Sequence, residues 1–183
     1  MGSTLKGELL GSRAYDSAAP VKLKFQLHNP YNEDLYVLTW FTPLEGLNSD
    51  CLTVTRNGKS KVPYDGPMIK RGKPGLNDYL LVPAGSTVTA DVDVNESYAV
   101  SRPGSYQVAL NIQAMECVPA SELAKAKASA ARAAPATMEA RKQTLRGGKV
   151  RFKVTPGPVQ LPTRGETARR VSKALAKSTG PIY

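Results

Sequence analysis

Residues 51–64 read CLTVTRNGKSKVPY, and this stretch decides the fold class. Two runs that favour strands, residues 51–56 and 59–64, flank the dipeptide Asn57-Gly58. Asn-Gly between such runs is the strongest short-range signal of a β-hairpin, because a type I′ turn needs positive φ at both central residues. The sequence therefore predicts a hairpin with its tip at Asn57-Gly58.

Further strands are expected on both sides of this hairpin. Residues 21–27 alternate apolar and polar side chains, which places Val21, Leu23, Phe25 and Leu27 on one buried face. The other runs that favour strands are residues 35–41, 78–82, 87–94, 105–112 and 149–154. Short strands at this spacing, separated by Gly and Pro turns, predict an all-β fold, an immunoglobulin-like antiparallel β-sandwich.

The expected domain limits follow from where this pattern starts and stops. Residues 1–19 are expected to be an N-terminal extension, and residues 20–156 are expected to form the sandwich. Within the sandwich, residues 119–147 are rich in Ala and Lys, and Ser121 is a suitable N-cap, so we expect a short helical insertion there. Residues 157–183 are expected to be a basic C-terminal linker or tail.

Charge is distributed unevenly along the chain. Residues 1–120 hold 11 Lys and Arg against 12 Asp and Glu, whereas residues 121–183 hold 14 against 3, which together give the net charge of +10. Nucleic-acid binding would need stacking aromatic side chains in the basic segment, whose only aromatics are Phe152 and Tyr183. We therefore expect no nucleic-acid partner, and interpret the segment as a solvated surface or as a contact with an acidic protein.

No set of residues in the sequence has the spacing of a known catalytic site. The chain has one histidine, His28, and it lacks His-Glu-x-x-His, Cys-x-x-Cys and Gly-x-Ser-x-Gly motifs. No second ligand stands near His28, and the alternation of Asp91 and Asp93 favours a solvated strand edge over a calcium site. No apolar run is long enough to cross a membrane. We expect a binding module that is not an enzyme, with no metal or cofactor of its own and no membrane partner.

Several short motifs occur in a fixed order along residues 20–110. They are TPLEGL (42–47), TRNG (55–58), YDGPMIKRG (64–72), Tyr79, PAG (83–85) and Tyr98. In this order they resemble the N-terminal propeptide domain of secreted deuterolysin-type zinc peptidases, the aspzincins, which include the peptidyl-Lys endopeptidases. The catalytic half of that family, with its His-Glu-x-x-His helix, is missing from the chain, and the resemblance does not extend to residues 119–147.

The resemblance implies a function for the domain. It would be secreted with its peptidase, assist the folding of the catalytic domain and inhibit that domain until processing. Zinc would belong to the partner peptidase, which is the expected partner. A secreted, non-catalytic adhesion or carbohydrate-binding module remains the alternative.

The aromatic side chains would have a different role under each of these two functions. Trp40 and the tyrosines 36, 64, 79, 98 and 106 are interpreted as core or corner residues of the sandwich. In a carbohydrate-binding module they would instead form a binding strip on the surface.

Secretion also bears on the two cysteines, Cys51 and Cys117. In a secreted domain a disulfide between them is the simplest pairing, and the sequence leaves open whether the two side chains meet.

A peptidase that selects lysine suggests which residues of the chain it contacts. Lys59 at the hairpin tip is the first candidate for a substrate mimic, and Lys70 and Lys73 in the following loop are the others; the alternative role is a solubilising surface lysine. In the tail, Arg169 and Arg170 are expected to lie against an acidic enzyme surface. Tyr183 is expected to be the end left by processing before a lysine.

Overall fold

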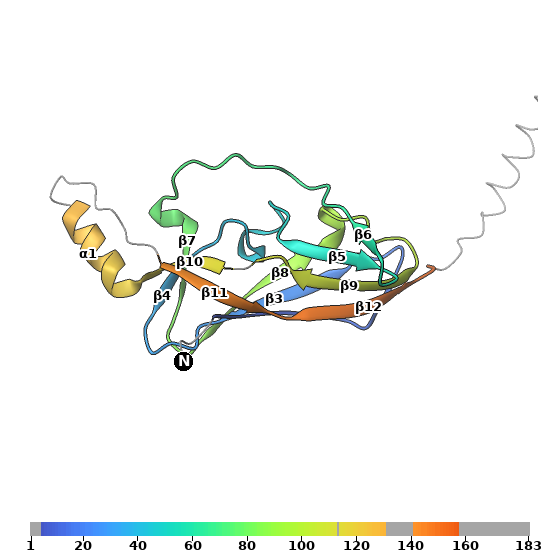
Figure 1. The fold of residues 1–183 in the computed structure, drawn as a ribbon, viewed down its shortest axis with the longest axis horizontal. Coiled ribbons are helices and arrows are strands. Elements are labelled where there is room, and N and C mark those ends of the chain that lie inside the picture. The colour runs from blue at the N-terminus through green and yellow to red at the C-terminus, as the bar shows by residue number, and fades with distance from the viewer. Residues whose placement is uncertain (1–4, 113, 131–140, 158–183) are drawn as a thin grey trace, which may run out of the picture.

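The computed structural model describes residues 5–112, 114–130 and 141–157, and these form an all-β sandwich of two sheets, as the sequence predicts (Figure 1). In spatial order, the seven-stranded sheet holds β7 (Tyr79–Val82), β4 (Leu35–Leu38), β10 (Ala114–Pro119), β11 (Arg141–Gly147), β1 (Leu5–Gly11), β3 (Lys22–His28) and β8 (Thr87–Asp93). The five-stranded sheet holds β2 (Ala14–Asp16), β12 (Lys149–Thr155), β9 (Gly104–Leu110), β5 (Leu52–Arg56) and β6 (Ser60–Val62). Helix α1 (Ala120–Ala130) packs against β10 and β4, and the 3-10 turns are η1 (Pro43–Glu45), η2 (Leu76–Asp78) and η3 (Val94–Glu96).

The hairpin expected with its tip at Asn57-Gly58 is confirmed. β5 and β6 pair antiparallel from Val54 opposite Val62 to Arg56 opposite Ser60. Between them Asn57 has φ +52° and Gly58 has φ +74°, the left-handed backbone that a type I′ turn requires. The Asn57 side chain also accepts a hydrogen bond from the Ser105 backbone N–H at 3.0 Å, so the tip is fixed to the start of β9.

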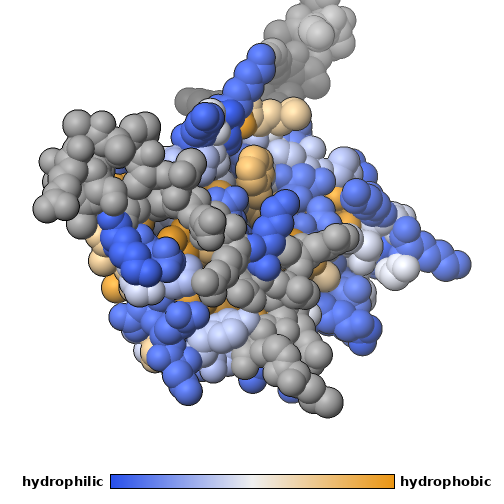
Figure 2. All heavy atoms as spheres, turned by 60° about the vertical axis from the view of Figure 1, so that its left-hand side comes forward, coloured by the Kyte–Doolittle hydropathy of each residue, from blue (hydrophilic) through white to orange (hydrophobic). Residues whose placement is uncertain are grey.

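The hydrophobic core lies between the two sheets. The alternation in β3 buries Leu23, Phe25 and Leu27, and β5 adds Leu52 and Val54. On the face shown in Figure 2, the described side chains are mostly hydrophilic, with small hydrophobic patches between them. Burial of apolar area, at roughly 25 cal/mol per Å², is therefore the main source of stability for the sandwich.

A tyrosine fixes the corner before β9. The Tyr106 hydroxyl donates a hydrogen bond to the Arg102 carbonyl, four residues earlier, at 2.7 Å. This is the tyrosine corner found in immunoglobulin-like sandwiches. The Tyr106 ring also stacks on Phe152 of β12, with ring centroids 5.5 Å apart.

Among the connections between the two sheets, three are short, with three residues or fewer between consecutive strands. β1 leads into β2, β9 leads into β10, and β11 leads into β12 across Gly148. Because β9 pairs with β12 and β10 pairs with β11, the last two of these segments form one long bent antiparallel ribbon that runs along the sandwich (Figure 1). Strands that switch sheets at a bend are a known way of closing the corners of a sandwich.

Residues 5–16 belong to the sandwich, which corrects the expected N-terminal extension over residues 1–19. β1 pairs antiparallel with β3 and parallel with β11, and β2 pairs parallel with β12. The sequence does not indicate this strand clearly, because a glycine, Gly7, stands at a buried position where an alternating strand would have an apolar side chain. A Cβ at Gly7 would lie 2.8 Å from Leu110 Cδ1, so a larger residue there would require the Leu110 side chain to move.

The expected helical insertion at residues 119–147 also needs correction. α1 accounts for its start, but Arg141–Gly147 form β11, and residues 131–140 lie outside the described part of the chain. Leu145 is buried, whereas the rest of β11 is polar or glycine, so the sequence shows no alternation there. Backbone pairing with β10 and β1 on its two edges holds this strand in place.

The strand expected at residues 35–41 ends three residues early, at Leu38. Phe41 has φ +59° and its side chain is 55% exposed, so the chain leaves the sheet before it. Trp40, expected in the core or at a corner, is half-buried in the loop after β4. This loop forms part of the surface described next.

Candidate functional site

An apolar groove of about 840 Å³ lies between the loop after β4 and the loop after β6. We call these two loops, residues 39–50 and 63–75, the platform. The groove is lined mainly by Phe41, Tyr64, Pro67, Met68 and Ile69, with Lys61 and Lys70 among its polar lining. Both motifs that carry most of the family resemblance, residues 42–46 and 64–72, lie in the platform.

The first loop is shaped by η1 and its caps. The Thr42 side chain accepts from the Leu44 N–H at 3.2 Å and donates to the Thr39 carbonyl at 2.6 Å. Pro43 stands at the start of the turn, where its missing N–H costs nothing, and Gly46 ends the turn with φ +81°. These contacts place the Glu45 carboxylate beneath the second loop.

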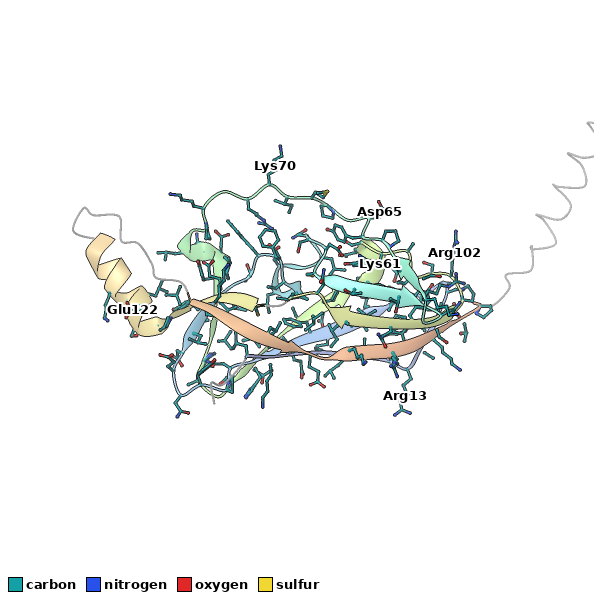
Figure 3. The ribbon with its side chains drawn as sticks, in the orientation of Figure 1. Arg13, Lys61, Asp65, Lys70, Arg102 and Glu122 are labelled. Atoms are coloured by element: carbon teal, nitrogen blue, oxygen red, sulfur yellow. The ribbon has the colours of Figure 1, made fainter. Side chains whose placement is uncertain are left out.

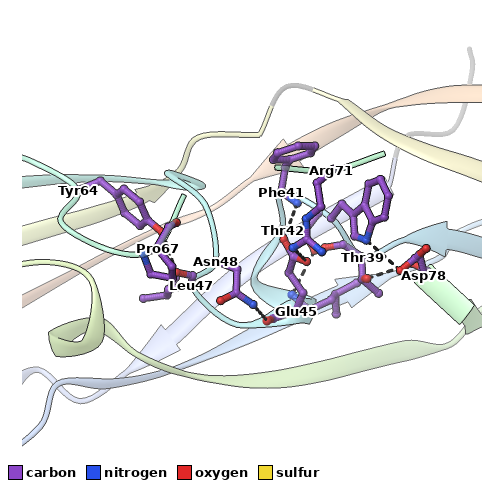
Figure 4. A network of polar contacts seen from close by, with 12 residues as sticks. Thr39, Phe41, Thr42, Glu45, Leu47, Asn48, Tyr64, Pro67, Arg71 and Asp78 are labelled. Atoms are coloured by element: carbon purple, nitrogen blue, oxygen red, sulfur yellow. Dashed lines mark hydrogen bonds and ion pairs between the residues drawn. The ribbon is translucent and has the colours of Figure 1, made fainter. Parts of the chain in front are cut away.

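Arg71 joins the two loops. Its guanidinium donates to Glu45 Oε2 at 2.5 Å (Figure 4). It also lies over the Trp40 ring, 5.0 Å from the ring centroid. The other oxygen of Glu45 accepts from the Phe41 N–H at 2.9 Å, and the Trp40 indole donates to Asp78 at 3.1 Å. The Glu45 and Arg71 side chains are only 10% and 20% exposed, so solvent screens this ion pair less than a surface pair.

Tyr64 fixes the beginning of the second loop. Its hydroxyl lies 2.9 Å from the Leu47 carbonyl oxygen and 2.7 Å from that of Pro67 (Figure 4). Its ring packs edge-on against Tyr98, and burial raises the pKa of Tyr64 above its ordinary value. The Tyr98 hydroxyl in turn donates to Asp50 at 2.8 Å; burial, followed by this hydrogen bond, raises the pKa of Tyr98.

The middle of the second loop is exposed. Met68 is 93% exposed and Ile69 is 44% exposed, and no backbone hydrogen bond joins Met68, Ile69 or Lys70 to any other described residue. In Figure 3 the Lys70 side chain projects away from the sandwich. The platform therefore presents unpaired backbone groups beside apolar side chains.

The lysines expected to be important are not brought together. Lys70 lines the groove and Lys73 lies further along the same loop, whereas Lys59 is exposed at the hairpin tip and is not part of the groove lining. Lys61 lines the groove and was missed by the sequence reasoning. Its position on the outer face of β6, next to buried Val62, was readable from the alternation.

The other candidate residues that the structure describes are not part of the groove lining. Cys51 and Cys117 are both buried and free, so the possible disulfide is not formed, and burial raises the pKa of each thiol to about 12. His28 Nδ1 lies 3.1 Å from the Thr87 hydroxyl, and Asp91 pairs with Lys24 on the surface. Arg169, Arg170 and Tyr183 lie outside the described residues and stay predictions.

Within residues 5–112, 114–130 and 141–157, no group of three or more His, Cys, Asp and Glu side chains is placed to hold a metal ion. No helix in this part of the chain has the length and apolarity to cross a membrane.

Comparison with known proteins finds a similarity to part of a protease. No family model matches the chain. An extracellular protease from Aeromonas hydrophila is 30% identical over 92 residues, which cover 50% of this chain and 26% of that protein. The chain thus matches about a quarter of the length of that relative.

Proposed function

We propose that this chain is the propeptide domain of a secreted aspzincin metallopeptidase, and that it inhibits the catalytic domain and assists its folding. The observation that carries the proposal is the platform. Two motifs far apart in sequence are joined through Arg71, Glu45 and Trp40, and the result is an exposed apolar groove. An exposed apolar surface with a polar rim is typical of a site that a partner covers.

The partner of this surface would be the peptidase that the propeptide accompanies. The similarity to a segment of an extracellular protease supports both secretion and a protease partner. The deuterolysin type comes from the motifs at residues 42–47 and 64–72, and the catalytic zinc would lie in the partner domain. The net charge of +10 would favour association with an acidic enzyme.

A titration tests this function. The full 183-residue chain is added to the active catalytic domain of a deuterolysin-type peptidyl-Lys peptidase, and hydrolysis of a lysine-containing peptide is followed. We expect activity to fall in proportion to added chain and to vanish at a one-to-one ratio. We also expect the chain to raise the yield when the denatured catalytic domain is refolded.

Two controls make the outcome specific. The heat-unfolded chain should not inhibit, and a serine peptidase that cleaves after lysine should not be inhibited by the folded chain. Binding to glycans with no effect on the metallopeptidase would reject the proposal in favour of an adhesion or carbohydrate-binding module.

A further inference from the structure

We infer that residues 67–70 are the segment that enters the substrate cleft of the peptidase, bound as an extended strand with the Lys70 side chain in the pocket that selects lysine. This inference rests on the proposed function and names the part of the chain that performs it. It is carried by the backbone of the loop, by its two anchors and by the order of its side chains.

The backbone of this segment is ready to pair with another chain. From Pro67 to Gly72 it contains no turn or bend, and the N–H and C=O groups of Met68, Ile69 and Lys70 make no hydrogen bond to the described residues. A partner that binds an extended peptide supplies main-chain hydrogen bonds of this kind, with pockets for the side chains. Peptidase clefts are sites of this type.

Both ends of the segment are anchored. On one side the Tyr64 hydroxyl lies between the carbonyl oxygens of Pro67 and Leu47, and on the other side Arg71 is held by Glu45 and Trp40. A loop fixed at both ends loses little conformational entropy when it binds. The anchors thus favour tight binding of an otherwise unsupported loop.

The side chains follow the order that such an enzyme would select. Exposed Met68 and Ile69 precede Lys70, so a peptidase that cleaves before lysine would meet the Ile69–Lys70 bond as its scissile bond. Hydrolysis would add one water and leave an Ile69 carboxylate and a Lys70 amine. Because both new ends remain anchored to the platform, the cut chain would keep its contacts and continue to occupy the cleft.

The local backbone structure also distinguishes Lys70 from Lys59 and Lys73. The residues before Lys59 are Asn57 and Gly58, whose left-handed backbone in the type I′ turn differs from the extended form of a bound substrate. Lys73 lies at a bend and is not part of the groove lining. Lys70 is the candidate that lies in an anchored loop, on a stretch of backbone without a turn or bend.

Alanine substitutions in the full chain test the assignment, with the inhibition constant for the deuterolysin-type peptidyl-Lys peptidase as the readout. Lys70→Ala should raise the constant at least tenfold, equivalent to about 1.4 kcal/mol. Lys59→Ala and Lys73→Ala are matched controls on exposed lysines and should change it less than about twofold. An unchanged constant for Lys70→Ala, or a larger effect of Lys59→Ala, overturns the inference while inhibition by the unaltered chain still upholds the proposed function.

A second variant tests the anchors. Glu45→Gln keeps an acceptor for the Phe41 N–H but weakens the pairing with Arg71, so the peptidase should cut the Ile69–Lys70 bond at least several times faster. Mass spectrometry locates the cut, and circular dichroism checks that the variant is folded. Cleavage elsewhere in the folded chain, with the Ile69–Lys70 bond left intact, contradicts the inference. If the unaltered chain has no effect on the peptidase, the proposed function itself fails.

Discussion

The Arg71 side chain makes two contacts that join the loops of the candidate site. One guanidinium donates to a carboxylate on the first loop and covers the indole of Trp40, which itself is held by Asp78. Lysine is a poor replacement, because a point charge on a flexible stem neither stacks on the ring nor offers the planar set of donors. Arg71 thus joins the second loop to two residues of the first loop that are far from it in sequence.

Gly66 is a second residue on which the second loop depends. A Cβ there would lie 2.4 Å from Ser97 Oγ and 2.6 Å from the Tyr64 ring, whereas a Cβ at Gly72 would meet nothing within 4 Å. We expect Gly66→Ala to lower the free energy of unfolding by about 1–3 kcal/mol through overpacking, and Gly72→Ala to change it little. Urea unfolding measures both, and equal midpoints for the two variants would contradict the packing described here.

The two cysteines give a prediction about reactivity and pH. Because Cys51 and Cys117 are buried and free, a thiol reagent near pH 8 should label neither in the folded chain and both in guanidinium chloride. Burial raises the pKa of each thiol from 9.0 to about 12 in the folded state, so above about pH 9 the unfolded chain loses these protons first. Unfolding then releases protons, and stability should fall as pH rises from about 9 toward 12.

Counting the reactive thiols also tests the alternative, a disulfide between Cys51 and Cys117. No labelling in guanidinium chloride without a reductant, followed by labelling of two thiols once a reductant is added, would establish a disulfide between Cys51 and Cys117. Labelling of both in the folded chain would show that the thiols are not buried.

At the scale of elements, Tyr106 anchors the corner that leads into β9. Tyr106→Phe keeps the stacking on Phe152 but removes the hydrogen bond to the Arg102 carbonyl, leaving that oxygen to find water. We expect a loss of about 1–2 kcal/mol of unfolding free energy. Tyr36→Phe is the matched control, since its hydroxyl bonds to no residue in the described ranges, and it should cost much less. Equal losses would argue against a specific role of the corner.

The elements that the sequence predicts well are those set by local patterns. β3 follows from strict alternation, and the β5–β6 hairpin follows from Asn57-Gly58. The sequence did not predict β1 and β11, because both strands are placed by residues far away in the chain. In β1, Gly7 packs against Leu110. The mostly polar β11 is held by backbone pairing with β1 and β10 on its two edges. The local pattern of apolar and polar residues cannot predict such pairing.

The candidate site was predictable only in part, for the same reason. The motifs around Glu45 and Arg71 could be recognised in the sequence, but that the two side chains meet is a tertiary fact about residues 26 positions apart. The preference for Lys59 over Lys70 came from the expected rigidity of the hairpin tip. The tip has the expected turn and is hydrogen-bonded to Ser105, whereas Lys70 lies at the groove.

On the scale of the whole molecule, β1 connects two halves of the larger sheet. β7, β4, β10 and β11 lie on one side of it and β3 and β8 on the other, and Leu5 at its start is fully buried. A chain that begins at residue 20 should therefore fail to unfold cooperatively, as followed by circular dichroism against urea. Leu10→Ala, at a 40% exposed position of the same strand, is the control and should keep a cooperative transition. A fully cooperative unfolding transition of the shortened chain would instead support the expectation that residues 1–19 are an extension outside the sandwich.

The parallel pairing of β1 with β11 also sets the order of events during synthesis. Leu5 pairs with Leu145, so β1 receives this neighbour only about 140 residues later in synthesis. At about 5–20 residues per second the delay is roughly 7–28 s. During that time β1 can pair with β3 while its other edge stays open to strands of other chains. Completion of the larger sheet thus waits for translation of β11, and until then one edge of β1 lacks its partner strand.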